Sequence, residues 1–74
     1  MTYTIAIIED LNGEIKVNFD KTGNKYLVGI YHNETKEYTY KEYSTHEEAK
    51  QIYIKLTTAI LEGTYSYEDR KKML

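Results

Sequence analysis

Cysteine, proline and tryptophan are all absent from this 74-residue chain. Without cysteine there is no disulfide, no thiolate nucleophile and no sulfur ligand for zinc. A chain of this size buries only about 60% of the surface that its unfolded form exposes, so packing or a partner has to supply its stability. We expect one small domain over residues 1–74, and the lack of cysteine favours a cytoplasmic location.

Long apolar runs are also missing. The longest, Ile5-Ala6-Ile7-Ile8, is far shorter than the roughly 20 residues that a membrane-spanning helix needs. The residues that precede it carry no basic region, so the sequence predicts no secretory signal. With 30% charged and 41% hydrophobic residues, the composition is that of a soluble globular protein without a membrane partner.

The first half of the chain alternates apolar and polar residues in the manner of β-strands. Strands are predicted at 2–9 and 14–20, joined by a type I′ turn at Asn12-Gly13. This turn pairs Glu9 with Lys16, Ile8 with Val17, and Ala6 with Phe19. The same register leaves an apolar set on the opposite side of the first strand, which is a candidate contact face: Tyr3, Ile5 and Ile7.

Two more strands and a helix follow. Strands are predicted at 25–32 and 37–43, with polar turns before each of them. Ser44 and Glu47 have the spacing of a capping box, which predicts a helix that ends at Gly63. The helix has one apolar stripe. Its members are Ala49, Ile52, Tyr53, Leu56 and Ile60.

These elements define the expected fold class as α+β. An antiparallel four-stranded β-meander packs on one amphipathic α-helix, and a second short helix at 66–74 is left open. No repeat or linker divides the chain.

Residues capable of chemistry are few and scattered. His32 and His46 match no metal-ligand spacing and have no obvious triad partner, so we expect both to be solvent-exposed or to act as caps. Residues 10–14 resemble part of an EF-hand loop, but their place between two strands favours a plain hairpin turn. The sequence predicts a non-enzyme with no catalytic, cofactor or metal site and no evident small-molecule substrate.

Tyrosine is the one enriched residue type, with nine copies. Four of them and two lysines gather around the third and fourth strands and form a candidate interaction face: Tyr31, Tyr38, Tyr40, Tyr43, Lys36 and Lys41. Three interpretations stay open. The tyrosines cover a half-exposed sheet, anchor a protein interface, or stack on nucleic-acid bases beside the lysines.

Residues 25–56, two strands with a polar turn followed by a capped helix, resemble the small DNA-binding domains of the plant AP2 type and of phage-integrase arm-binding regions. Those domains lay a three-stranded sheet in the major groove. This chain departs from their arginine-rich sheet, because its only arginine is Arg70 and the acids Glu34, Glu37 and Glu42 interrupt the face. No DNA-binding residue is therefore carried over.

The function that we expect is a small protein-interaction module that binds another protein or itself, for example as a homodimer. Small size and enrichment in Lys, Glu, Tyr and Ile are typical of accessory or inhibitor proteins of phages and mobile elements. The alternative is a nucleic-acid-binding module that uses the tyrosine and lysine face. The net charge of −2 disfavours that alternative.

Overall fold

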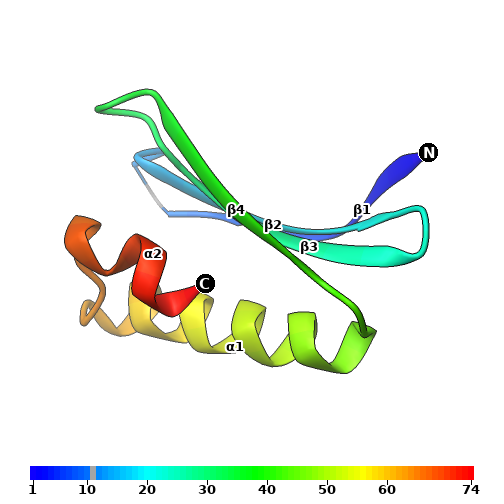
Figure 1. Ribbon diagram of the computed structural model, residues 1–74. Helices are drawn as coiled ribbons and strands as arrows, with labels where there is room; N and C mark the ends of the chain where they lie inside the picture. The colour runs from blue at the N-terminus through cyan, green and yellow to red at the C-terminus, as the bar shows by residue number, and fades with distance from the viewer. Residues whose placement is uncertain (11) are drawn as a thin grey trace.

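The computed structural model describes residues 1–10 and 12–74 and has four strands followed by helices. The elements are β1 (Thr2–Glu9), β2 (Ile15–Thr22), β3 (Lys25–His32), β4 (Glu37–Tyr43), α1 (His46–Glu62), the 3-10 turn η1 (Tyr67–Asp69) and α2 (Arg70–Met73). The strands form one antiparallel sheet in the order β1-β2-β3-β4. Both α1 and α2 lie on the same side of this sheet (Figure 1). The predicted four-stranded meander and its helix are thus confirmed, and the C-terminal segment that the sequence left open forms η1 and α2.

The predicted register of the first hairpin is correct. Glu9 pairs with Lys16, Ile8 with Val17, and Ala6 with Phe19. At the turn, Asp10 Oδ1 accepts hydrogen bonds from the amides of Asn12 and Glu14. The turn includes Leu11, which is outside the described residues, so the type I′ geometry assigned to Asn12-Gly13 stays a prediction.

A β-bulge in β1 corrects the predicted position of Tyr3. The register shifts between Thr4 and Ala6, so Ile5 is an extra residue and Tyr3 pairs with Lys21. Lys21 lies on the same side of the sheet as Val17 and Phe19, which is the side that faces α1. Tyr3 therefore does not share a face with Ile7, because the extra residue reverses the alternation along the strand.

Helix α1 begins one residue later than the sequence predicts. The N-cap is Thr45, not Ser44: Thr45 is extended (φ −125°, ψ 150°) and its Oγ1 accepts from the amide of Glu48 at 3.2 Å. Each of these two residues has a glutamate three positions later, so both match the capping-box pattern. The helix ends at Gly63, as predicted, because the left-handed conformation there (φ 76°) suits glycine.

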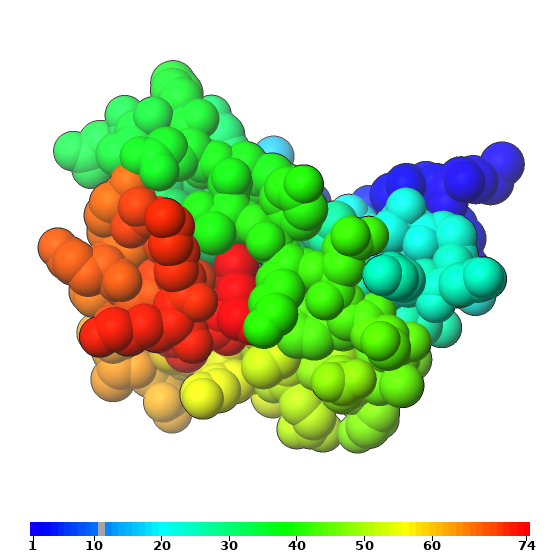
Figure 2. Space-filling model, in the orientation of Figure 1, coloured from blue at the N-terminus to red at the C-terminus, as the bar shows by residue number. Residues whose placement is uncertain are grey.

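The core lies between the sheet and α1. Val17, Phe19, Val28 and Ile30 from the sheet meet Ala49 and Leu56 of the predicted helix stripe, and Tyr43 and Leu74 complete the cluster. Figure 2 shows the C-terminal residues, in red, inserted between β4 and α1. The end of the chain is therefore a part of the core.

Candidate functional site

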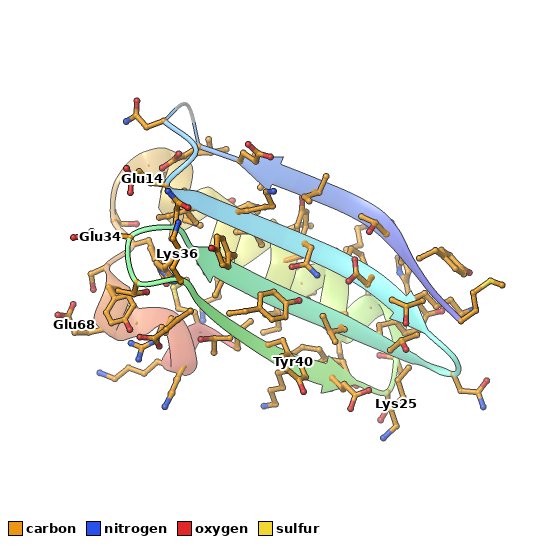
Figure 3. All side chains as sticks on the ribbon, turned by 90° about the horizontal axis from the view of Figure 1, so that it is seen from above. Glu14, Lys25, Glu34, Lys36, Tyr40 and Glu68 are labelled. Atoms are coloured by element: carbon orange, nitrogen blue, oxygen red, sulfur yellow. The ribbon has the colours of Figure 1, made fainter. Side chains whose placement is uncertain are left out.

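The face of the sheet that points away from α1 has no element of the described chain packed on it (Figure 3). We call this surface the open face. One row of paired residues crosses it from edge to edge, namely Ile7, Asn18, Gly29 and Tyr40. Ile7 at one edge is 55% exposed and Tyr40 at the other is 57% exposed. Two large apolar side chains are thus exposed to solvent at the two ends of the same row.

The ring of Tyr38 lies across the centre of the open face. A Cβ at Gly29 would lie 2.1 Å from Tyr38 Oη, so the ring occupies the space that any side chain at Gly29 would fill. Tyr38 donates a hydrogen bond of 3.1 Å to Asn18 Oδ1 and stacks on Tyr40, with ring centroids 5.6 Å apart. Burial against the sheet raises the pKa of Tyr38, so its hydroxyl remains a donor at neutral pH. The Tyr38 ring is therefore held against the sheet at the centre of the open face.

The candidate interaction face predicted from sequence is divided between different parts of the molecule. Tyr31, Tyr38 and Tyr40 have open-face register positions. Tyr43 is buried on the other side of the sheet, where its hydroxyl donates to the carbonyl of Leu74.

The two lysines of the predicted face are also separated from the open-face tyrosines. Lys41 pairs with Val28 and so belongs to the side of Tyr43. Lys36 lies in the turn between β3 and β4, where its φ is 60°. Grouping by sequence proximity was wrong here, because neighbouring strand residues point to opposite faces.

The two faces predicted from sequence prove to be in part the same surface. Ile7 belongs to the open face together with Tyr38 and Tyr40, although Ile7 lies on one edge strand and the tyrosines lie on the other. The sequence shows which residues of a strand share a side. It does not show which side of β1 lies on the same face of the sheet as a given side of β4. That requires the order and register of all the strands.

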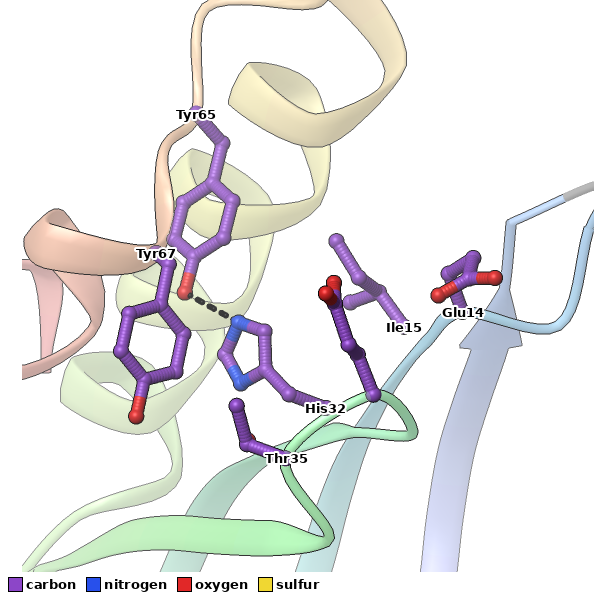
Figure 4. A pocket seen from close by; sticks show the side chains of 7 residues that line it. Glu14, Ile15, His32, Thr35, Tyr65 and Tyr67 are labelled. Carbon is purple, nitrogen blue, oxygen red and sulfur yellow. Dashed lines mark hydrogen bonds between the residues drawn. The ribbon is translucent and has the colours of Figure 1, made fainter.

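A second candidate site surrounds His32 at the other side of the sheet (Figure 4). This side chain is only 6% exposed, so the predicted solvent or capping role is wrong. Its Nε2 lies 2.9 Å from Tyr65 Oη, and the two rings are stacked with centroids 5.8 Å apart. Tyr67 meets the imidazole edge-on, with centroids 4.9 Å apart. The C-terminal segment thus buries a histidine at the end of β3.

His46 has a different environment. It is exposed, and its ring packs beside Phe19 and Tyr26 with centroids 5.2 and 5.4 Å away. It covers one end of the core and does not cap α1, whose cap is Thr45.

An ion pair and a hydrogen bond hold the C-terminal segment to β4. Tyr67 donates a hydrogen bond to Glu37, and Arg70 Nη2 lies 3.7 Å from Glu37 Oε2. The Arg70 guanidinium stacks over the Tyr67 ring at 3.8 Å from its centroid. Sequence reasoning missed Tyr65, Tyr67 and Arg70 as site residues. The Ser66-x-x-Asp69 cap predicts local structure in this segment, but nothing in the pattern names its partner strand.

His32, Tyr65 and Tyr67 border an open-sided pocket of about 410 Å³. It is lined by Glu14, Ile15, His32, Glu34, Thr35, Tyr65 and Tyr67. Tyr65 and Tyr67 lie across the pocket from Glu14 in Figure 4. The walls are therefore aromatic on one side, and carboxylates from two turns contribute the charge.

The protonation of the pocket follows from burial. Burial lowers the pKa of His32, Arg70 lowers it further, and Glu37 acts in the opposite direction. Burial raises the pKa of Tyr65 to about 12. Both groups are neutral at pH ~7, and among the described residues His32 Nδ1 has no hydrogen-bond partner. No carboxylate of the described residues is hydrogen-bonded to the imidazole, where it could orient the ring as a general base.

Among residues 1–10 and 12–74, no three acidic, histidine or cysteine side chains group together in a way that could hold a metal ion. Within the same residues no helix is long and apolar enough to cross a bilayer.

Comparison with known proteins found no match to this chain among family models, curated proteins or solved structures. The resemblance of residues 25–56 to AP2-type and integrase arm-binding domains thus stays a likeness of pattern. Any proposal about function has to come from the geometry of this molecule.

Proposed function

We propose that this protein is a small protein-interaction module that works through the open face of its sheet, and that its partner there is a second copy of the same chain. The observation that carries the proposal is the row from Ile7 to Tyr40, with an exposed apolar side chain at each edge. Exposed aromatic and aliphatic side chains on an ordered surface are typical anchors of protein interfaces.

The symmetry of this row favours self-association. Two sheets pack face to face about 10 Å apart, with their strands within about 30° of one another. A two-fold axis between the sheets and along the strands would lay β1 of one copy over β4 of its partner. Since Ile7 and Tyr40 lie in one row, each Ile7 would then contact the partner's Tyr40. The two-fold axis makes this contact occur twice, once at each edge of the interface, as an isologous interface requires.

The size of the open face predicts a weak dimer. Four strands about 4.8 Å apart, with eight residues of about 3.3 Å each, give a face on the order of 500 Å². Stable interfaces bury about 800 Å² on each partner, and smaller ones belong to transient complexes. We therefore expect a dissociation constant in the micromolar range or weaker.

The charges of the open face support a protein partner over a nucleic acid. Glu9 and Lys16 neutralise each other at 3.4 Å, and the acids Asp20 and Glu42 have open-face register positions. Lys25 and Lys36 lie at opposite ends of the sheet (Figure 3). Phosphates laid along the tyrosines would meet carboxylates there, which is unfavourable.

Sedimentation equilibrium over a concentration series tests the proposal. We expect a monomer–dimer equilibrium that changes little with salt and is lost in Ile7→Glu and in Tyr40→Ser, because each change removes an apolar contact from both halves of the interface. Ile54→Glu is the matched control, since Ile54 is also exposed (44%) but lies on α1, away from the sheet face. That variant should still dimerise.

Three results would overturn the proposal. The first is a chain that stays monomeric up to millimolar concentration. The second is a dimer that survives both open-face substitutions. The third is a salt-sensitive shift of a labelled oligonucleotide that is lost in Tyr40→Ser, which would favour the nucleic-acid alternative.

A further inference from the structure

The pocket beside His32 has the aromatic walls that recognise organic cations. Tyr65 and His32 are stacked, and Tyr67 stands at 81° to the imidazole, so three aromatic rings that contact one another border one space. Ring faces carry a negative quadrupole that attracts a cation within about 6 Å. The space of about 410 Å³ is large enough for a substituted ammonium group and its chain.

Two carboxylates give the same pocket its charge. Glu14 follows the β1–β2 turn, Glu34 lies in the β3–β4 turn, and both line the pocket. Neither lysine nor arginine is among the described residues that line the pocket. The lining therefore disfavours anions, and its aromatic side disfavours a hydrated metal ion that would have to shed its water.

The molecule already contains one cation on this aromatic cluster. The Arg70 guanidinium rests on the Tyr67 ring, with its charge balanced by Glu37. His32 adds no positive charge of its own, because burial and Arg70 lower its pKa. Its Nδ1 is buried without a partner, so the hydrogen bonding of the pocket wall is incomplete within the described chain.

We propose that this pocket binds an organic ammonium cation with alkyl groups on its nitrogen, held by Tyr65, Tyr67 and His32 and neutralised by Glu14 and Glu34. The alkyl groups contact the rings and Ile15, while the positive charge faces the carboxylates. A free quaternary amine such as choline and a trimethylated lysine of another protein share this chemistry. The site lies on the opposite side of the sheet from the open face, and it does not depend on self-association.

Titration with choline, followed by amide chemical shifts of the isotope-labelled chain, tests the site. Choline should move the amide signals of Ile15, His32 and Tyr65. Its neutral carbon analogue, 3,3-dimethylbutan-1-ol, has the same shape without the charge. We expect it to bind on the order of tenfold more weakly, because it keeps the alkyl contacts and loses the cation–π and carboxylate attraction. A blocked trimethyllysine peptide in the same assay tells a protein source from a small-molecule source.

Substitutions of the exposed carboxylates leave the packing of the pocket intact. Glu14→Gln combined with Glu34→Gln should weaken choline binding severalfold, while Glu62→Gln, at an acid that is also exposed and lies at the end of α1, should not change it. Tyr65→Phe keeps the ring and should keep most of the binding. The proposal fails if choline and the neutral alcohol produce equal shifts, if the double variant binds as the wild type does, or if choline produces no shift in the folded chain.

Discussion

At the scale of single residues, His32 shows how the fold changes the chemistry of a side chain. In the sequence it is a polar residue beside a turn. In the structure, Tyr65 and Tyr67 cover it, so that its proton equilibrium depends on a segment more than 30 positions away. Periodicity contains no information on such a contact. The sequence therefore predicted the strand that carries His32 and failed to predict its burial.

The lowered pKa of His32 predicts how stability depends on pH. As the pH falls below the ordinary histidine value of 6.5, the unfolded chain takes up a proton before the folded chain does. The free energy of unfolding should therefore decrease from pH ~7 towards pH ~5, above the range where carboxylates titrate. Urea unfolding across this range measures the decrease, and His32→Gln should make it smaller. An unchanged slope in that variant contradicts the assignment to His32.

At the scale of elements, alternation and helical periodicity were sufficient. The strands, the first-hairpin register and the apolar stripe of α1 were all predictable, because a one-residue error would move every apolar side chain into water. Two local details escaped the pattern. The bulge at Ile5 depends on how β1 meets β2, and the choice between two adjacent capping residues depends on where β4 ends.

The position of the helix cap can be tested directly. Thr45→Ala should lower the free energy of unfolding by about 1 kcal/mol, because the Glu48 amide loses its acceptor. Ser44→Ala is the matched control and should change it by less than about 0.5 kcal/mol, as surface substitutions usually do. Chemical denaturation of the two variants measures both values. A larger loss of stability in Ser44→Ala than in Thr45→Ala would mean that Ser44 is the N-cap, as the sequence pattern predicted.

At the scale of the whole molecule, the C-terminal segment closes the structure. Leu74 is buried in the core, its carbonyl accepts from Tyr43, and Arg70 and Tyr67 attach the same segment to Glu37. These contacts join residues that lie about thirty positions apart. They bury the polar end of β3 and build one wall of the pocket. For this reason the candidate site could not be predicted from the sequence, although most of the fold could.

Leu74→Ala should therefore destabilise the molecule although it changes the last residue of the described chain. We expect a loss of about 2 kcal/mol, near the lower end for buried leucine, because a chain end can relax into the space. Lys72→Ala, on the exposed side of the same segment, should change stability by less than about 0.5 kcal/mol. Thermal or urea unfolding compares the two. Equal stabilities of the two variants would mean that the burial of Leu74 contributes little to the stability of the core.

The extra residue at Ile5 also limits how sheets of neighbouring molecules can join. β1 is an edge strand, and a straight edge offers a repeating ladder of free amides and carbonyls on which another chain can template itself. The offset at Ile5 interrupts that ladder midway along the strand, so an added strand cannot stay in phase over its full length. We therefore expect the bulge to disfavour sideways growth into filaments at this edge, even in a tyrosine-rich sheet.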